Sequence, residues 1–244
     1  MGCTIGWIKS KEGCIIFKNR DTRKNLRGDL VKITRNSIKI CHQRGRKGCW
    51  IGINKGLGFA SAKGPYRELL ENRASYARFD ELGEMILERA NNLERALKLF
   101  IESYKKQKIG KSANILLCNT NKAYLLELCS EKISIKSYSR FVFRTNHFLS
   151  MRKFNKNFEF LNISVKRLKK FRELFSIYKP KNAEQLIPIL SYHSKDSEEN
   201  ICRHGIISTI GSAIFEISRS GVTLWYSLND NPCRNKFSKC HVTM

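Results

Sequence analysis

The sequence lacks any apolar run near the ~20 residues that a membrane-spanning helix needs. Its N-terminus also lacks the positively charged segment followed by an apolar stretch that marks a signal peptide. The nine cysteines form no CxxC pair, and several lie in apolar runs, as the reduced and buried thiols of cytosolic proteins do. We therefore expect a cytoplasmic protein with no membrane span.

Metal-ligand spacings and acidic residues are also scarce. The five histidines show no HxxxH or Cys-plus-His spacing, so we expect neither a metal nor a cofactor. Only 21 Asp and Glu face 46 Lys and Arg, which gives a formal net charge of +25. This charge permits attraction to nucleic acid, but the basic residues are spread along the whole chain, with no recognition helix, RNP-like motif or zinc finger. We expect no specific nucleic-acid partner; a basic nucleic-acid-binding protein without catalysis is the alternative interpretation.

The 244 residues, 41% of them hydrophobic, are enough for a sizeable core, and we expect one domain over residues 1–244. Strand-like runs occupy 4–9, 14–18, 30–35, 37–42, 49–53, 57–61, 113–118, 123–128, 133–138, 141–144, 205–218 and 222–228. Helical periodicity marks 65–77, a segment capped by Asp80, another capped by Asn92, 162–177 and 183–192. This order predicts an α+β fold, a four-layer αββα sandwich with two antiparallel sheets between helical layers. We expect residues 234–244 to form a loosely held tail.

The first 21 residues contain the candidate nucleophile. If Met1 and Gly2 are removed, Cys3 carries both a thiol and a free α-amine. An α-amine has a pKa of about 7.7–8.0, so near neutral pH it can accept the thiol proton. The runs on either side of residues 10–13 predict a β-hairpin. Such a hairpin returns Asp21 and Arg20 beside Cys3, where Asp21 could orient the amine and Arg20 could stabilise a thiolate.

Several segments together carry a resemblance to a known family. They are Cys3-Thr4, Asn19-Arg20-Asp21, Gly52–Leu57, Arg144–Phe148, and Ile201–His204 followed by Thr209 and Ser212. In order and spacing they resemble the N-terminal-nucleophile amidohydrolases, which include choloylglycine hydrolase, penicillin V acylase and the isopenicillin N acyltransferase/carcinine hydrolase group. The resemblance implies the αββα fold and favours Asn146 as a donor to the oxyanion. It also implies that Arg203 contacts the nucleophile or a substrate carboxylate, with Arg219 as the alternative.

These observations predict an N-terminal cysteine amidohydrolase or acyltransferase, matured by removal of Met1-Gly2 as a propeptide. Its partner would be a small N-acyl amide, cleaved at a linear amide bond. The sequence leaves open the substrate, the choice of water or an amine as acceptor, and the oligomeric state, a homo-oligomer included. The second oxyanion donor is also open, with Ser61 or a backbone N–H as candidates. An acylated membrane-anchored protein also begins Met-Gly-Cys, but that pattern wants Ser or Thr at position six, where this chain has Gly6.

Overall fold

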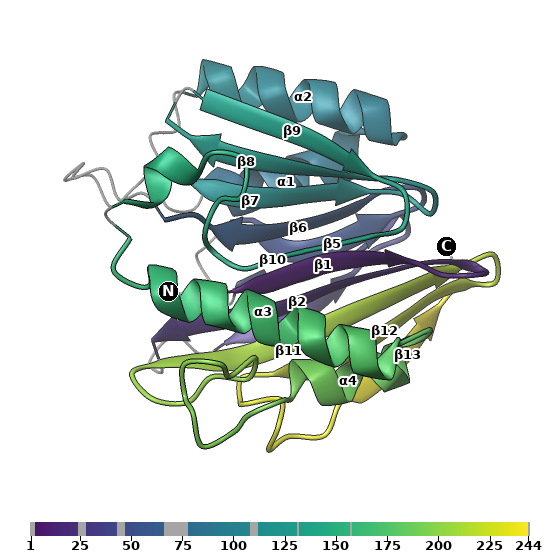
Figure 1. The fold of residues 1–244 in the computed structure, drawn as a ribbon. Helices are drawn as coiled ribbons and strands as arrows, with labels where there is room; N and C mark the ends of the chain where they lie inside the picture. Colours follow the sequence, from purple (N-terminus) through teal and green to yellow (C-terminus); the bar gives the residue numbers. More distant parts are fainter. Residues whose placement is uncertain are drawn as a thin grey trace.

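The computed structural model describes residues 3–23, 28–42, 47–65, 78–107, 112–130, 132–156 and 158–243. Within these residues the strands form two antiparallel sheets, and four α-helices lie on the outer faces of those sheets (Figure 1). This α+β arrangement is the one that the order of elements predicted.

The first sheet has the strand order β10-β1-β2-β11-β12-β13. Its strands are β1 (Thr4–Lys9), β2 (Gly13–Arg23), β10 (Phe141–Arg144), β11 (Ile207–Ser218), β12 (Gly221–Leu228) and β13 (Ser238–Val242). The predicted hairpin is present, with Thr4 paired to Asn19 and Lys9 to Cys14. Strand β13 lies within the segment that we expected to be loosely held. β13 pairs with β12, so that backbone groups of β12 that would otherwise lie at the sheet edge gain hydrogen-bond partners.

The second sheet runs in sequence order from β3 to β9. Its strands are β3 (Asp29–Ile33), β4 (Ser37–His42), β5 (Cys49–Asn54), β6 (Gly58–Lys63), β7 (Ala113–Cys118), β8 (Ala123–Cys129) and β9 (Lys132–Tyr138). It is a meander, and the first two helices are inserted between β6 and β7.

The helices are α1 (Arg78–Arg89), α2 (Leu93–Lys106), α3 (Leu161–Tyr178) and α4 (Ala183–Leu190), and a 3₁₀ turn, η2, spans Arg152–Asn155. The Asn92 side chain caps α2 as predicted, whereas Asp80 lies inside the first turn of α1. The helix expected over 65–77 lies, from residue 66 on, outside the described residues. The apolar residues of the helix predicted over 162–177 favour an inward-facing Val165. In the structure Val165 is 45% exposed, because the buried stripe of α3 runs through Ser164, Leu168 and Phe171.

Three apolar clusters separate four layers. One lies between the sheets and includes Trp7 and Ile16; a second lies between the β3–β9 sheet and α1 and α2. The third lies between the other sheet and α3 and α4, and includes Phe17. Successive side chains of β2 therefore point alternately into the intersheet cluster and toward α3 and α4. This alternation determines which residues of β2 lie near each other in the site. Among the described residues, no helix combines the length and apolar character needed to cross a membrane.

Candidate active site

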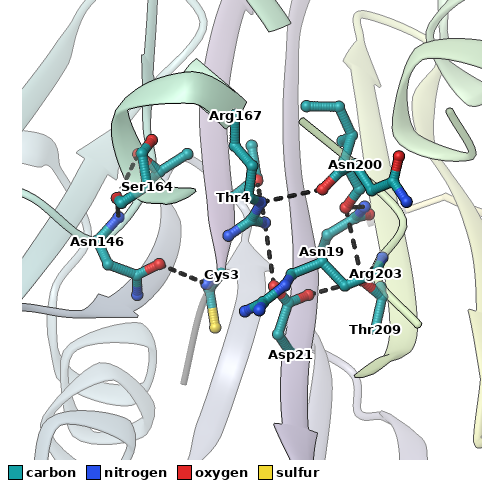
Figure 2. Close-up of polar contacts among 12 residues, drawn as sticks. Cys3, Thr4, Asn19, Asp21, Asn146, Ser164, Arg167, Asn200, Arg203 and Thr209 are labelled. Carbon is teal, nitrogen blue, oxygen red and sulfur yellow. Dashed lines mark hydrogen bonds and ion pairs between the residues drawn. The ribbon is translucent and has the colours of Figure 1, made fainter. Parts of the chain in front are cut away.

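Cys3 directly precedes β1 and is 6% exposed. Its backbone N–H donates a hydrogen bond of 2.9 Å to Oδ1 of Asn146, which follows the neighbouring strand β10 (Figure 2). Two further hydrogen bonds, one from the side chain and one from the backbone, hold Asn146 in place. Its Nδ2 donates to the carbonyl oxygen of Lys63 at 2.7 Å, and its backbone N–H donates to Oγ of Ser164 at 3.0 Å. The nitrogen of Cys3 is thus held by a side chain that α3 and β6 keep in place.

The register of the first hairpin assigns the residues of β2 to opposite faces. Thr4 pairs with Asn19, so Cys3 lies next to Arg20 across the ladder, and cross-strand neighbours share a face. Cys3 belongs to the cluster between the sheets. Lys18 and Arg20 therefore project toward that intersheet side, while Asn19 and Asp21 project toward α3.

Asp21 lies in a buried network on the α3 side. Its Oδ2 forms an ion pair of 3.0 Å with Nη2 of Arg167, and its Oδ1 accepts a hydrogen bond of 2.7 Å from the Thr209 hydroxyl. Arg167 also donates to Oγ1 of Thr4 at 2.9 Å and to the carbonyl of Asn200 at 3.1 Å. Burial raises the pKa of Asp21, and the charge of Arg167 opposes that rise. Asp21 is therefore linked to Thr4, the residue next to Cys3, through Arg167, which contacts both side chains.

Arg203 joins this group from the segment before β11. Its backbone N–H donates to Oγ1 of Thr209 at 2.8 Å. Burial lowers the pKa of Arg203, while the negative charges of Asp21 and of a Cys3 thiolate oppose that effect. Arg219 lies at the far end of β11, beside the tip of the first hairpin, because β11 pairs Ser218 with Gly13. Of the two arginines, Arg203 is the one near the candidate nucleophile.

Arg20 is engaged elsewhere on the intersheet side. Its Nη1 lies 2.6 Å from Oδ2 of Asp29, and its Nη2 lies 3.2 Å from Nδ1 of His42. Nε2 of His42 lies 2.9 Å from Oδ2 of Asp80, and the Ser61 hydroxyl donates to the other Asp80 oxygen at 2.8 Å. Burial alone would lower the pKa of His42, but hydrogen bonds to Asp29 and Asp80 raise it. Arg20 is therefore part of a buried ionic network on Cys3's face.

Lys18 is the cation on this face that sequence reasoning missed. Its Nζ donates to the carbonyl of Trp50 at 3.1 Å and to Oγ of Ser61 at 3.3 Å. Burial lowers the pKa of Lys18, and the charge of a Cys3 thiolate is the largest effect in the opposite direction. The side chain of Lys63 is exposed at the end of β6. Desolvation by its neighbours lowers the pKa of Lys63, and the charges of Asp80 and Cys3 oppose that effect. Lys18, Lys63 and Arg203 thus all lie within electrostatic reach of Cys3.

His147 follows Asn146 but points into the packing beneath α3. Its Nδ1 lies 2.9 Å from Oγ of Ser164 and 3.2 Å from Oγ1 of Thr145. Burial, with the charges of Arg144 and Arg172, lowers the pKa of His147 to about 4. The ring is therefore neutral near pH 7 and supports the segment that carries Asn146.

A scan against protein families matches residues 8–231 to the family described as acyl-coenzyme A:6-aminopenicillanic acid acyl-transferase. The matched residues include Asp21, Asn146 and Arg203, whereas Cys3 precedes them. No curated protein matches the sequence. Among solved structures, the Anbu (Gly-1) mutant from Hyphomicrobium sp. strain MC1 is similar with a TM-score of 0.43 and 7% sequence identity, over 99% of this chain and 88% of that one. The family match spans nearly the whole chain and confirms the resemblance seen in the motifs: the protein belongs to the acyl-coenzyme A:6-aminopenicillanic acid acyl-transferase family, of the N-terminal-nucleophile hydrolase type.

Proposed function

We propose that this protein is an N-terminal cysteine amidohydrolase or acyltransferase that acts on the linear amide bond of a small N-acyl compound. The observation that supports this most directly is the 2.9 Å hydrogen bond from the Cys3 N–H to Asn146 Oδ1. It holds the nitrogen that would become the α-amine at a defined place beside the thiol. A terminal cysteine whose amine is positioned in this way carries its own nucleophile and its own base.

The reaction would begin with attack of the Cys3 sulfur on the acyl carbon, while the thiol proton passes to the α-amine. The former carbonyl oxygen then carries the negative charge of a tetrahedral intermediate. As the C–N bond breaks, the ammonium group of Cys3 gives its proton to the leaving amine, and a thioester remains. Water or a second amine attacks the thioester and loses a proton to the α-amine. Cys3 leaves as a thiol, and a free acid or a new amide is released.

The neighbouring side chains fit distinct roles in these steps. Asn146 has two N–H bonds on Nδ2; one is directed to Lys63, and we assign the other to the oxyanion. Lys18 and Arg203 supply positive charge that favours the thiolate. Asp21 acts as a positioning residue, because its partner Arg167 binds the hydroxyl of Thr4, the residue next to Cys3.

Arg20 and Ser61 have supporting roles in this proposal. Arg20 neutralises Asp29 and contacts His42, and this network continues through Asp80 to Ser61. Ser61 in turn accepts a hydrogen bond from Lys18. Arg20 therefore supports the cation that faces Cys3, and a backbone N–H remains our candidate for the second oxyanion donor.

Maturation is part of the proposal, because the amine exists only after Gly2 has been removed. Once Met1 is gone, the Cys3 sulfur attacks the carbonyl carbon of Gly2. The Gly2–Cys3 bond breaks as the nitrogen takes a proton, which leaves glycine as a thioester on Cys3. Water then hydrolyses the thioester and releases glycine, the thiol and a free α-amine. Glycine has no side chain to obstruct this attack.

The decisive experiment combines intact mass with a screen of N-acyl amides, on wild type, Cys3→Ala and the control Cys14→Ala. Cys14 is also a buried thiol between the sheets, but it lies at the opposite end of β2. We expect wild type and the control to lack Met1 and Gly2 and to release amine. Cys3→Ala should retain Gly2, keep its unfolding temperature, and lose activity by a factor on the order of 10⁴ or more. An active wild type that retains Gly2 would contradict the proposal, since its proposed base would not exist.

A further inference from the structure

Three side chains with metal-binding atoms meet away from the Cys3 site. His193 follows α4, His204 precedes β11, and Cys233 follows β12; their ligand atoms all lie within 4.8 Å of one another. Nε2 of His204 is 3.2 Å from Sγ of Cys233, and the two imidazole rings are 5.3 Å apart between centroids. Imidazole nitrogen and thiolate sulfur are the ligands that zinc prefers in proteins.

Cys202 lies beside this group and could supply a fourth ligand. Its Sγ lies 3.9 Å from Nε2 of His204, the imidazole nitrogen that is also 3.2 Å from Sγ of Cys233. Cys202 is fully buried whereas His193 is exposed, so the group extends from the interior to the surface. A metal ion could therefore enter from solvent on the side of His193.

The segments that carry these side chains are already held together by hydrogen bonds. The Cys202 N–H donates to the carbonyl of Tyr192 at 2.9 Å, and Asn231 Nδ2 donates to the carbonyl of Arg203 at 3.2 Å. Nδ1 of His193 lies 3.4 Å from the carbonyl of Ser191. Metal-bound histidines commonly make such a contact to a backbone carbonyl, which leaves Nε2 for the ion. The ligands are thus arranged before any ion arrives.

We propose that His193, Cys202, His204 and Cys233 form a structural zinc site. Zn–S bonds of about 2.3 Å and Zn–N bonds of about 2.0–2.1 Å place tetrahedral ligand atoms roughly 3.4–3.8 Å apart. The observed separations of 3.2 and 3.9 Å bracket that range. The limit of 4.8 Å among His193, His204 and Cys233 requires only a small side-chain adjustment. Four protein ligands leave no open position for substrate, which makes the site structural.

This proposal reverses our expectation that the chain binds no metal. That expectation relied on spacing along the sequence, but only Cys202 and His204 are close in sequence; the other ligands come from distant segments. The zinc would tie the residues before β11 to those after β12 and would fix the backbone of Arg203, which lies between two ligands. The zinc site does not depend on the proposed amidase activity.

The test uses untagged full-length protein, so that no affinity tag contributes histidines. Elemental analysis should find about one zinc per wild-type chain after dialysis, and added Co²⁺ should give thiolate-to-metal absorption. Cys233→Ser and His193→Gln should each lose most of the bound zinc. His193 is exposed, so its substitution should leave the fold intact. The control Cys240→Ser removes a thiol on β13 and should bind zinc like wild type.

Two further measurements keep the result unambiguous. A chelator should lower the unfolding temperature of wild type and of Cys240→Ser, but not that of Cys233→Ser, because zinc stabilises only chains that bind it. Thiol counting on the metal-free protein should find Cys202 and Cys233 reduced. Zinc content that is negligible in wild type, equal in wild type and both ligand variants, or replaced by a Cys202–Cys233 disulfide would overturn the proposal.

Discussion

The two faces of β2 near Cys3 hold two separate buried ionic networks. On the side of α3, Asp21 pairs with Arg167 at 3.0 Å. On the intersheet side, Arg20 pairs with Asp29 at 2.6 Å, and His42 joins them. Three consecutive residues, Asn19, Arg20 and Asp21, are thus divided between two layers of the molecule. Successive side chains of a strand point to opposite faces of the sheet, so adjacent residues of β2 do not enter the same site.

The two networks have different relations to the candidate nucleophile. Arg167, which belongs to the first network, donates to the hydroxyl of Thr4 and so holds the residue next to Cys3. The intersheet face carries Lys18, whose charge interacts with the Cys3 thiolate. We infer that one face positions the nucleophile and that the other sets its electrostatic surroundings. Each prediction below tests this division, beginning with the largest expected effect.

Arg167→Met should destabilise the protein by about 3–5 kcal/mol, because it leaves the buried Asp21 carboxylate without its ion-pair partner. The same change removes hydrogen bonds to Thr4 and Asn200. Arg20→Met is the matched variant on the other face, and it should cost less because His42 remains 3.6 Å from Asp29. Denaturant unfolding of both variants measures the difference. A larger loss in Arg20→Met would contradict our ranking of the two networks.

The sequence predicted the layers and the positions of most strands along the chain, since these follow from apolar periodicity and turn residues. It did not reveal Arg167, because the segment 162–177 carries many Lys and Arg residues, and basic side chains on an amphipathic helix usually face solvent. The signal was present: Arg167 lies three residues after Ser164 and four before Phe171, on the buried stripe. Lys18 was missed for a similar reason, as the expected strand ended there, whereas β2 continues to Arg23. Contacts between distant segments, such as Asn146 with Lys63, have no local signature.

Asn146→Ala removes the side chain that binds the Cys3 nitrogen. The turnover rate should fall by about 10²–10³-fold, the usual effect of losing one oxyanion donor. Asn155→Ala is a suitable control, because Asn155 is also a buried asparagine, hydrogen-bonded to the backbone of Phe148. We expect this control to lose stability but to keep the turnover rate. Steady-state kinetics on a substrate found in the N-acyl amide screen provides the measurement, and equal rates in both variants would remove Asn146 from the site.

The buried His147 and the partly buried His42 should give the two faces opposite responses to pH. The pKa of His147 is about 4 in the fold, below the ordinary 6.5, so the unfolded chain binds a proton first as pH falls. His147 should therefore reduce stability between pH 6.5 and 4, by at most about 3 kcal/mol. The pKa of His42 is raised instead, so its contribution is complete below pH 6.5 and declines as pH rises through the folded pKa.

Unfolding curves across this pH range separate the two effects. His147→Asn, which retains a polar atom near the position of Nδ1, should reduce the loss of stability in acid. His42→Gln should remove the decline above pH 6.5 and leave the acid limb unchanged. If both variants altered the same limb, the two histidines would not experience the opposite environments that their partners indicate.

The smallest expected effect distinguishes Lys18 from Arg20, which share the intersheet face with Cys3. Lys18→Met should slow alkylation of Cys3 by iodoacetamide at neutral pH, because it removes a positive charge that faces the sulfur. We expect a change of about tenfold, which corresponds to about 1.4 kcal/mol. Arg20→Met should change the rate less, since the Arg20 charge is already neutralised by Asp29. Peptide mapping by mass spectrometry assigns the alkylation to Cys3 among the nine cysteines. Equal slowing in both variants would mean that the whole intersheet network, and not Lys18, sets the reactivity of the thiol.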